Sequence, residues 1–160
     1  SQRMIGVDYA ITNACVVSGN TELDVPATGK RISINRKARS IVLLHGLTLL
    51  VPSVTPMTYG SYRVTYANGS STEIPINSRN AVHWLSGAPR KNSWQHWAYQ
   101  YTWDASLAWE CATRSSDAIN LQSYEWVNQN PDDAIDSIEL IAKQNIPGLM
   151  IGLVAVTAVQ

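Results

Sequence analysis

Tryptophan and tyrosine gather in one stretch of this chain, residues 93–109, which has the sequence SWQHWAYQYTWDASLAW and holds four of the six tryptophans. Trp97, Tyr99, Tyr101 and Trp103 occupy every second position, so in extended backbone their rings would form one row. A flat indole can cover the apolar face of a sugar ring, and the polar tips of these side chains suit a half-hydrated site. The row predicts either a carbohydrate-binding platform or one face of a half-buried strand.

Cations and amides lie beside these aromatic residues in the sequence. Arg90 and Lys91 come shortly before Trp94, and a cation next to a stacking surface suits an acidic sugar, sulfated or uronic. Neighbouring amides can hydrogen-bond sugar hydroxyls. The predicted ligand-binding residues are Trp94, Trp97, Tyr99, Tyr101, Trp103, Arg90, Lys91, Asn92 and Gln95, with Gln100 as a further candidate amide.

A second basic stretch, KRISINRKAR at residues 30–39, allows two interpretations. Its charges could be the solvated face of a strand pair, or they could recognise an anionic glycan, because arginine forks match carboxylate and sulfate oxygens. The whole chain has twelve Lys and Arg against twelve Asp and Glu. This neutrality speaks against nucleic acid as the partner.

Catalytic motifs are missing from the sequence: GxSxG, HExxH, CxxC and the glycine-rich phosphate loops are all absent. His45, in the apolar VLLHG, is predicted to be a core histidine with satisfied hydrogen bonds, and His83 and His96 show no metal-ligand spacing. Asp132 and Asp133 are predicted to cap a turn. Carboxylates that meet only in space leave a small lyase or hydrolase open, but we expect a binding module and no enzyme.

Short strand signals separated by turn residues must position these side chains. About nine strands without helical spacers predict an all-β, antiparallel β-sandwich, and the length predicts one module over residues 1–160. The clearest hairpin is 59–76, where Asn68-Gly69 suits a two-residue turn. Residues 77–106 are the longest stretch without a predicted strand pair, which is typical of a functional loop or an extra hairpin.

Two further segments bear on the fold. The stretch PDDAIDSIELIAK could open a helix or form one turn followed by a strand. The apolar IPGLMIGLVAVTAV near the end is too short to span a bilayer and contains β-branched residues, so it predicts a buried strand and no membrane contact. Cys15 and Cys111 could form a disulfide or remain two buried thiols.

A series of blocks occurs in a recognisable order over residues 30–158: ISINRKARSIVLLHG, YGSYRVTYANGSSTEIPI, AVHWL, LAWEC, YEWVNQNPDDAIDSIEL and IGLVAVTA. Together they resemble the galactose-binding-like jelly-roll modules appended to glycoside hydrolases and polysaccharide lyases. NQNP departs from that pattern, in which a shorter Asn-Pro connection is typical. The resemblance implies that Trp84, Trp109 and Trp126 face the core.

The resemblance also implies a role. Such a module binds a polysaccharide or oligosaccharide, without a cofactor, and targets or supports a catalytic domain in a larger extracellular or periplasmic chain. The alternative is a structural module that packs its aromatic loop against a catalytic domain and binds no glycan. Modules of this type often hold a structural Ca²⁺. Oxygen donors occur near the start of the chain, at Asp8, Asn13, Glu22 and Asp24, but they lack an EF-hand-like spacing and no ligands are assigned.

Overall fold

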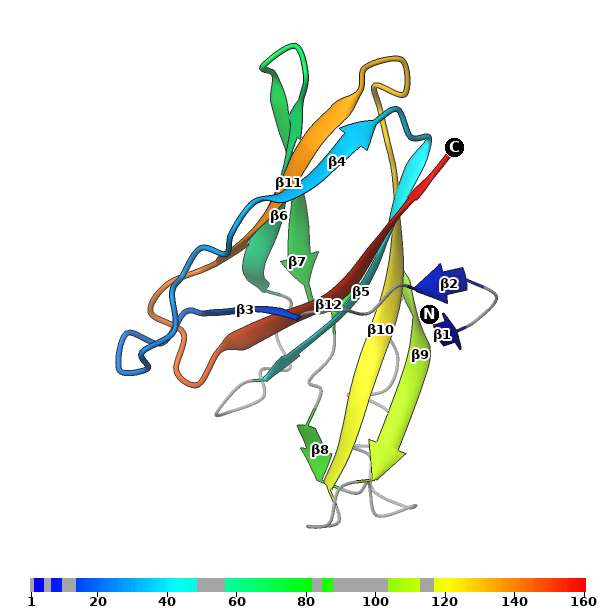
Figure 1. Ribbon diagram of the computed structural model, residues 1–160. Coiled ribbons are helices and arrows are strands. Elements are labelled where there is room, and N and C mark those ends of the chain that lie inside the picture. Colours follow the sequence, from blue (N-terminus) through cyan, green and yellow to red (C-terminus); the bar gives the residue numbers. More distant parts are fainter. Residues whose placement is uncertain are drawn as a thin grey trace.

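The chain folds as two antiparallel sheets that pack face to face, which confirms the predicted β-sandwich (Figure 1). The computed structural model describes residues 2–4, 7–9, 14–48, 57–81, 85–87, 104–112 and 117–160. Over these ranges the secondary structure is strands and turns, without a helix.

The larger sheet has six strands. Five of them lie in the order β3 (Cys15–Ser18), β12 (Met150–Val159), β5 (Ser40–Thr48), β10 (Asp117–Val127) and β8 (Leu85–Gly87), and β9 (Ala105–Ala112) pairs with β10. The smaller sheet has the order β4 (Ile32–Arg36), β11 (Ile135–Ala142), β6 (Thr58–Tyr66) and β7 (Ser71–Asn77). A separate pair is formed by β1 (Gln2–Met4) and β2 (Val7–Tyr9).

Alternating side chains build the core between the sheets. In β6, Tyr62, Val64 and Tyr66 are buried and belong to the main core cluster, while Arg63 between them is exposed. The central strand β5 is buried along its whole length. Its odd-numbered apolar residues join the main core, and its even-numbered ones join a second, smaller cluster on the opposite face. A strand that is buried on both faces explains the unbroken apolar run IVLL.

The hairpin of β6 and β7 ends in a three-residue loop, so the predicted two-residue turn was wrong. The amide of Tyr66 donates to the carbonyl of Ser70 at 2.9 Å, and the amide of Gly69 donates to the carbonyl of Tyr66 at 2.9 Å. Gly69 alone takes a positive φ, of 85°, as a hairpin loop of this length requires. Asn68 instead uses its Oδ1 to accept from the amide of Ser70.

The two further segments form strands. PDDAIDSIELIAK makes a turn at residues 131–133 and then becomes β11, as one of its two predicted alternatives required. Asp133 lies in this turn, and its carboxylate accepts from the side-chain amide of Asn68 at 3.0 Å. The terminal apolar run becomes β12, which is buried at residues 151–153 and 155, and its first part lies between β3 and β5.

Trp109 is not a core residue, and the cause is a β-bulge. It is 36% exposed, whereas Trp126 is half-buried and packs against the main core. The register between β9 and β10 shifts at Ala108, which places Trp109 opposite Leu121. Leu121 belongs to the smaller cluster on the outer face of the sheet. One extra residue in a strand reverses the face of the residues that follow it.

Alanine substitution should separate these two tryptophans. We expect Trp126→Ala to lower the free energy of unfolding by about 2 kcal/mol, because a half-buried ring loses part of the burial that a core ring would lose. Trp109→Ala should cost under about 1 kcal/mol. Urea unfolding of both variants measures the difference, and equal costs for the two would contradict the placement of Trp109 on the outer face.

Candidate functional site

The predicted ligand-binding residues lie outside the described part of the chain. This applies to Trp94, Trp97, Tyr99, Tyr101, Trp103, Arg90, Lys91, Asn92, Gln95 and Gln100, and also to Trp84, His83 and His96. The structure does describe Arg79 and Asp104, which lie on either side of these residues in the sequence.

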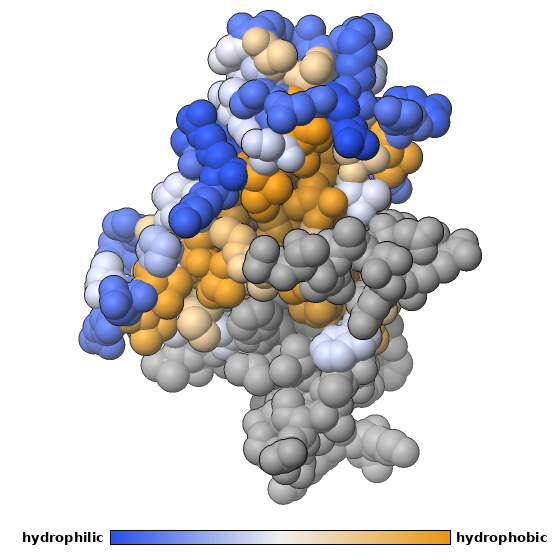
Figure 2. All heavy atoms as spheres, in the orientation of Figure 1, coloured by the Kyte–Doolittle hydropathy of each residue, from blue (hydrophilic) through white to orange (hydrophobic). Residues whose placement is uncertain are grey.

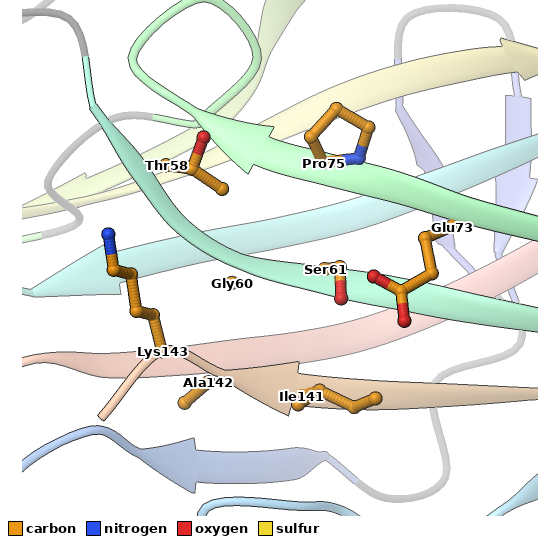
Figure 3. A pocket seen from close by; sticks show the side chains of 8 residues that line it. All are labelled: Thr58, Gly60, Ser61, Glu73, Pro75, Ile141, Ala142 and Lys143. Carbon is orange, nitrogen blue, oxygen red and sulfur yellow. The ribbon is translucent and has the colours of Figure 1, made fainter.

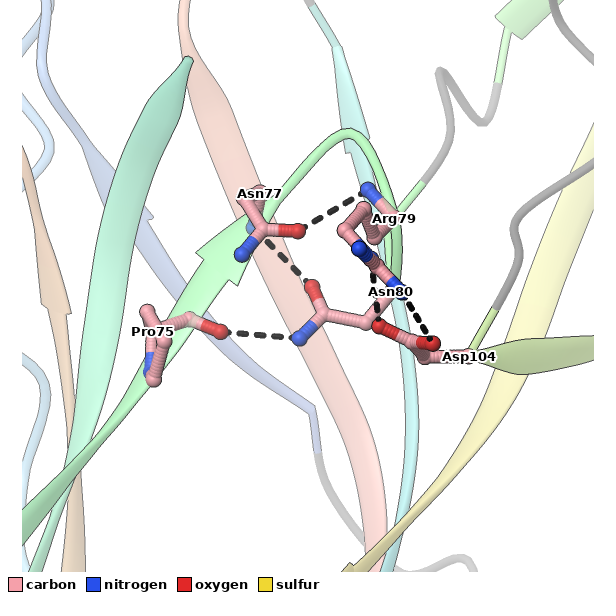
Figure 4. Close-up of polar contacts among 5 residues, drawn as sticks. All are labelled: Pro75, Asn77, Arg79, Asn80 and Asp104. Atoms are coloured by element: carbon pink, nitrogen blue, oxygen red, sulfur yellow. Dashed lines mark hydrogen bonds and ion pairs between the residues drawn. The ribbon is translucent and has the colours of Figure 1, made fainter. Parts of the chain in front are cut away.

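An ion pair joins Arg79 to Asp104 (Figure 4). We call residues 79–104, which contain the aromatic row, the aromatic segment. Arg79 Nε donates to Asp104 Oδ2 at 2.9 Å, and Arg79 Nη2 donates to Asp104 Oδ1 at 3.2 Å. The backbone amide of Asp104 also donates to the carbonyl of Arg79 at 3.0 Å. The hydrogen bond to Asp104 raises the pKa of the Arg79 guanidinium. We call this arrangement the base clamp; it places residues 79 and 104 beside one another although 25 positions separate them. Both side chains are exposed, so the ion pair itself adds little stability.

Asn80 ties the base clamp to the sandwich. Its Nδ2 donates to the carbonyl of Pro75 at 2.8 Å, and its Oδ1 accepts from the amide of Asn77 at 2.9 Å. The Oδ1 of Asn77 accepts in turn from the amide of Arg79 (Figure 4). Asn80 is buried, so these bonds satisfy polar groups that water cannot reach. The chain therefore leaves β7 through a turn with a single, well-specified geometry.

His45 lies beneath this turn and is a satisfied core histidine, as predicted. It is fully buried, its Nε2 is 2.7 Å from the carbonyl of Asn80, and its Nδ1 is 2.7 Å from the hydroxyl of Tyr62. A carbonyl can only accept, so Nε2 carries the proton and Nδ1 accepts from Tyr62. The ring stacks on Tyr62 and on Tyr124. Burial lowers the pKa of His45 to about 4, so the imidazole is neutral.

Gln122 adds an open hydrogen-bonding position to this buried cluster. It lies opposite His45 in the pairing of β10 with β5 and is 1% exposed. Its Oε1 is the one buried side-chain polar atom without a hydrogen-bond partner in the described part of the chain. Leaving a buried acceptor unsatisfied costs on the order of 1–3 kcal/mol, so this oxygen can gain from any donor that reaches it.

A groove of about 840 Å³ runs between one edge of each sheet. We call it the edge groove. Figure 2 shows an apolar surface there with hydrophilic side chains along its border. The groove is lined by Ala14, Cys15, Val16, Pro26, Thr28, Gly29, Lys30, Arg31, Ile32, Ser33, Ile34, Leu153, Val154, Ala155 and Val156.

The basic stretch predicted from the sequence lies along this groove. Lys30 and Arg31 line it, and Arg36 and Lys37 follow at the end of β4, all four exposed. The ion pairs of the described residues involve Arg63 and Arg79, and none includes these four cations. Positive charge without a local acidic partner attracts an anionic ligand.

A second, shallower depression of about 330 Å³ lies on the smaller sheet (Figure 3). Gly60 lies in its floor, where a Cβ atom would collide with the carbonyl of Ile141. Beside it Arg63 contacts Glu73 at 3.0 Å and Glu139 at 3.6 Å. Exposed ion pairs of this kind contribute little to stability. Because Arg63 is already paired with two carboxylates, it is not free to bind an anionic ligand in this depression.

Metal ligands and reactive thiols are not brought together in the described ranges. Glu22 and Asp24 lie in the exposed loop after β3, and the described residues hold no group of three His, Cys, Asp or Glu that could bind a metal ion. Asn13 and the side chain of Asp8 lie outside them, so calcium stays a prediction. Cys15 is a free, half-buried thiol, and burial raises its pKa, which disfavours the reactive thiolate.

The comparisons with known proteins add no relative. No protein-family model, curated protein sequence or solved structure matches the chain. The resemblance to galactose-binding-like modules therefore rests on the residues that carry it and stays a prediction. Within the described ranges, no helix is long and apolar enough to cross a membrane.

Proposed function

We propose that this chain is a carbohydrate-binding module that holds a polysaccharide for a catalytic domain in the same polypeptide. The observation that supports it is the base clamp. Arg79 and Asp104 join the two ends of the segment that carries the aromatic row, and Asn80 attaches that junction to Pro75 in β7 and to the buried His45. Such a module would act outside the cell or in the periplasm, where polysaccharide substrates occur.

The clamp favours binding for an entropic reason. Two positions that are already held together need not be brought together when a ligand binds between them. Sugars exchange many hydrogen bonds with water for bonds with protein, so net affinity is modest and depends on such pre-organisation. A scaffold that fixes the ends of a binding segment is the usual way in which β-sandwiches present ligand sites on loops.

Removing one ring of the aromatic row tests this proposal. We expect Trp97→Ala or Trp94→Ala to weaken glycan binding about five- to hundredfold, the equivalent of roughly 1–3 kcal/mol for one stacked ring. Calorimetric titration of the intact chain against a panel of neutral, uronic and sulfated polysaccharides measures the effect. The unfolding midpoint in urea should stay near that of the wild type.

Two controls accompany this measurement. Trp109→Ala removes an exposed indole that is not part of the row, and it should leave glycan affinity unchanged. Arg90→Ala should weaken binding of an anionic glycan only, and that binding should fall as salt rises. If the Trp94 and Trp97 variants bind normally but unfold at lower urea, the row belongs to the core and the proposal is wrong.

One observation favours the alternative of an interaction module. On the outer strand β9, Leu107 is 41% and Trp109 is 36% exposed. Exposed large apolar side chains on an edge strand suit contact with a neighbouring domain. In that case Trp109→Ala would weaken association with the catalytic domain, and Trp97→Ala would leave every polysaccharide affinity unchanged.

A further inference from the structure

The tip of the hairpin of β6 and β7 carries the one Asn-Gly sequence of the chain, Asn68-Gly69. Residues 67–70 are all exposed, so water and hydroxide reach this loop. An asparagine that precedes glycine can lose its side-chain amide without an enzyme, because the backbone nitrogen of the glycine can attack the side-chain carbon Cγ and no side chain hinders it. Apart from its chain neighbours, nothing lies within 4 Å of the position that a Cβ atom would take at Gly69.

The side chain of Asn68 is folded toward this nucleophile. Its Oδ1 accepts from the backbone amide of Ser70 at 2.8 Å and from the hydroxyl of Ser70 at 2.7 Å. These bonds turn the side chain back toward the backbone of the two residues that follow it. They also place two donors on the oxygen that becomes negative when a nucleophile adds to Cγ, and donors in this position stabilise the same charge in acyl-transfer enzymes.

The amide group of Asn68 also connects the hairpin to a neighbouring turn. Its Nδ2 donates to Asp133 Oδ2 at 3.0 Å, and Asp133 lies in the turn before β11, which is beside the hairpin tip in Figure 1. The backbone supports the same contact, since the amide of Ala67 donates to the carbonyl of Ala134 at 2.8 Å. The side-chain bond between hairpin and turn exists only while residue 68 carries an amide.

We propose that Asn68 is a site of spontaneous deamidation, that Ser70 promotes the reaction, and that the conversion breaks the contact with Asp133. The hydrogen bond from the Gly69 amide to the carbonyl of Tyr66 opens first, as bonds at an exposed hairpin tip do readily. Hydroxide removes the amide proton, and the nitrogen adds to Cγ of Asn68, which places negative charge on Oδ1. The bond from Cγ to Nδ2 then breaks, Nδ2 leaves as ammonia after taking protons from water, and a cyclic succinimide remains. Water opens this ring at either carbonyl, so that asparagine and water become aspartate or isoaspartate and ammonia.

The products differ from Asn68 in charge and, for isoaspartate, in backbone length. A carboxylate at residue 68 faces Asp133 as acceptor against acceptor, and like charges at this distance repel each other. Isoaspartate also inserts a methylene group into the main chain of the hairpin loop. The formal net charge of the chain falls by one unit from its value of 0. Aged protein should therefore contain a more acidic form in which the hairpin is less firmly attached to the turn before β11.

Peptide mapping of the intact chain after incubation at mildly alkaline pH tests the reaction. Trypsin releases residues 64–79 as one peptide, which contains Asn68 and also Asn77. Asn77 is the internal control, because its Oδ1 also accepts from the amide two residues further on, that of Arg79 at 2.9 Å, but a serine follows it. We expect mass spectrometry to find deamidation at Asn68 and at least about tenfold less at Asn77. Conversion of Asn77 as fast as that of Asn68 would overturn the inference.

Two serine variants test the promoting role of Ser70. Ser70→Ala removes one of the two donors from Oδ1 of Asn68 and should slow the conversion roughly two- to fivefold, less than in a buried active site because the loop is exposed. Ser71→Ala makes the same change one position further on, where the hydroxyl does not bond to Asn68 in the described hairpin, and it should deamidate at the wild-type rate. Equal rates for these two variants would overturn the role of Ser70.

The consequence for the fold is tested by variants that carry the product from the start. Asn68→Asp should lower the urea midpoint by roughly 0.3 M. Adding Asp133→Asn restores a carboxylate and an amide with exchanged roles and should recover the midpoint, whereas adding Asp132→Asn, the same charge change at the exposed neighbour, should recover little of it. An unchanged midpoint for Asn68→Asp, or equal recovery by both second changes, would contradict the loss of the contact. These measurements involve no glycan, so their outcome does not depend on the proposed carbohydrate binding.

Discussion

Acidification from above pH 6.5 to about pH 4 is expected to remove about 3 kcal/mol of the free energy of unfolding through His45 alone. Burial lowers the pKa of this imidazole from 6.5 to about 4, so the unfolded chain binds a proton in this window and the folded chain does not. As the pH falls, the free energy of the unfolded state, which binds more protons, decreases relative to that of the folded state. Stability is therefore greatest above pH 6.5, declines through the window and stays lower below about 4.

The geometry explains why the folded protein resists this proton. Nδ1 of His45 accepts from the hydroxyl of Tyr62, and protonation there would force this hydroxyl to accept and to turn its own hydrogen away from the partner that it has now. The second nitrogen already donates to the carbonyl of Asn80, and the ring is enclosed between Tyr62 and Tyr124. A charged imidazole would thus be buried without an acidic partner.

His45→Gln provides the comparison. An amide can keep a donor for Asn80 and an acceptor for Tyr62, but it does not titrate. Urea unfolding at several pH values should show that the wild type loses about 3 kcal/mol more than the variant across this range. The carboxylates common to both proteins cancel in the difference. An NMR titration in which the His45 ring has its midpoint near 6.5 would contradict the account.

The strands could be predicted from the sequence because their side chains alternate. Tyr62, Val64 and Tyr66 are separated by polar residues, and the structure buries all three. The ambiguous segment PDDAIDSIELIAK forms β11, because burial between two neighbouring strands outweighs a weak local helix signal. The terminal run forms β12, as its β-branched residues predict. A sandwich of such strands follows from the pattern alone.

Features that depend on partners far away in the sequence could not be predicted. The bulge that exposes Trp109 arises where β9 meets β10, and nothing in LAWEC indicates it. The base clamp joins Arg79 to Asp104 across 25 positions, and the edge groove combines β4 with β12. The basic stretch itself was visible in the sequence, but the apolar floor beside it appears only once the sheets are packed.

The block NQNP, which departs from the pattern of the resembling modules, is the clearest example of a feature that depends on residues far away in the sequence. In the structure Asn128 is buried, whereas Gln129 and Asn130 after it are exposed. Asn128 Oδ1 accepts from the hydroxyl of Tyr66 at 2.7 Å and from the amide of Asn130 at 2.9 Å. Its Nδ2 donates to the carbonyl of Ala38 at 2.8 Å and to that of Asn130 at 3.1 Å. One amide therefore joins β6, the segment before β5 and the turn before β11.

Asn128→Ala should consequently be among the most damaging single changes, with a loss of about 3–5 kcal/mol in the free energy of unfolding. The substitution leaves the hydroxyl of Tyr66 and the carbonyl of Ala38 without partners in a region from which water is excluded, and each unsatisfied group carries its own desolvation cost. Gln129→Ala is the matched control, because that exposed side chain donates only to the carbonyl of Val127, and it should change stability by under about 0.5 kcal/mol.

A double-mutant cycle with Tyr66→Phe identifies the cause: if the unpaired hydroxyl carries part of the cost, the two changes together should cost less than their sum. Strict additivity, or a loss for Asn128→Ala no larger than that for Gln129→Ala, would show that the buried amide does not hold these three segments together.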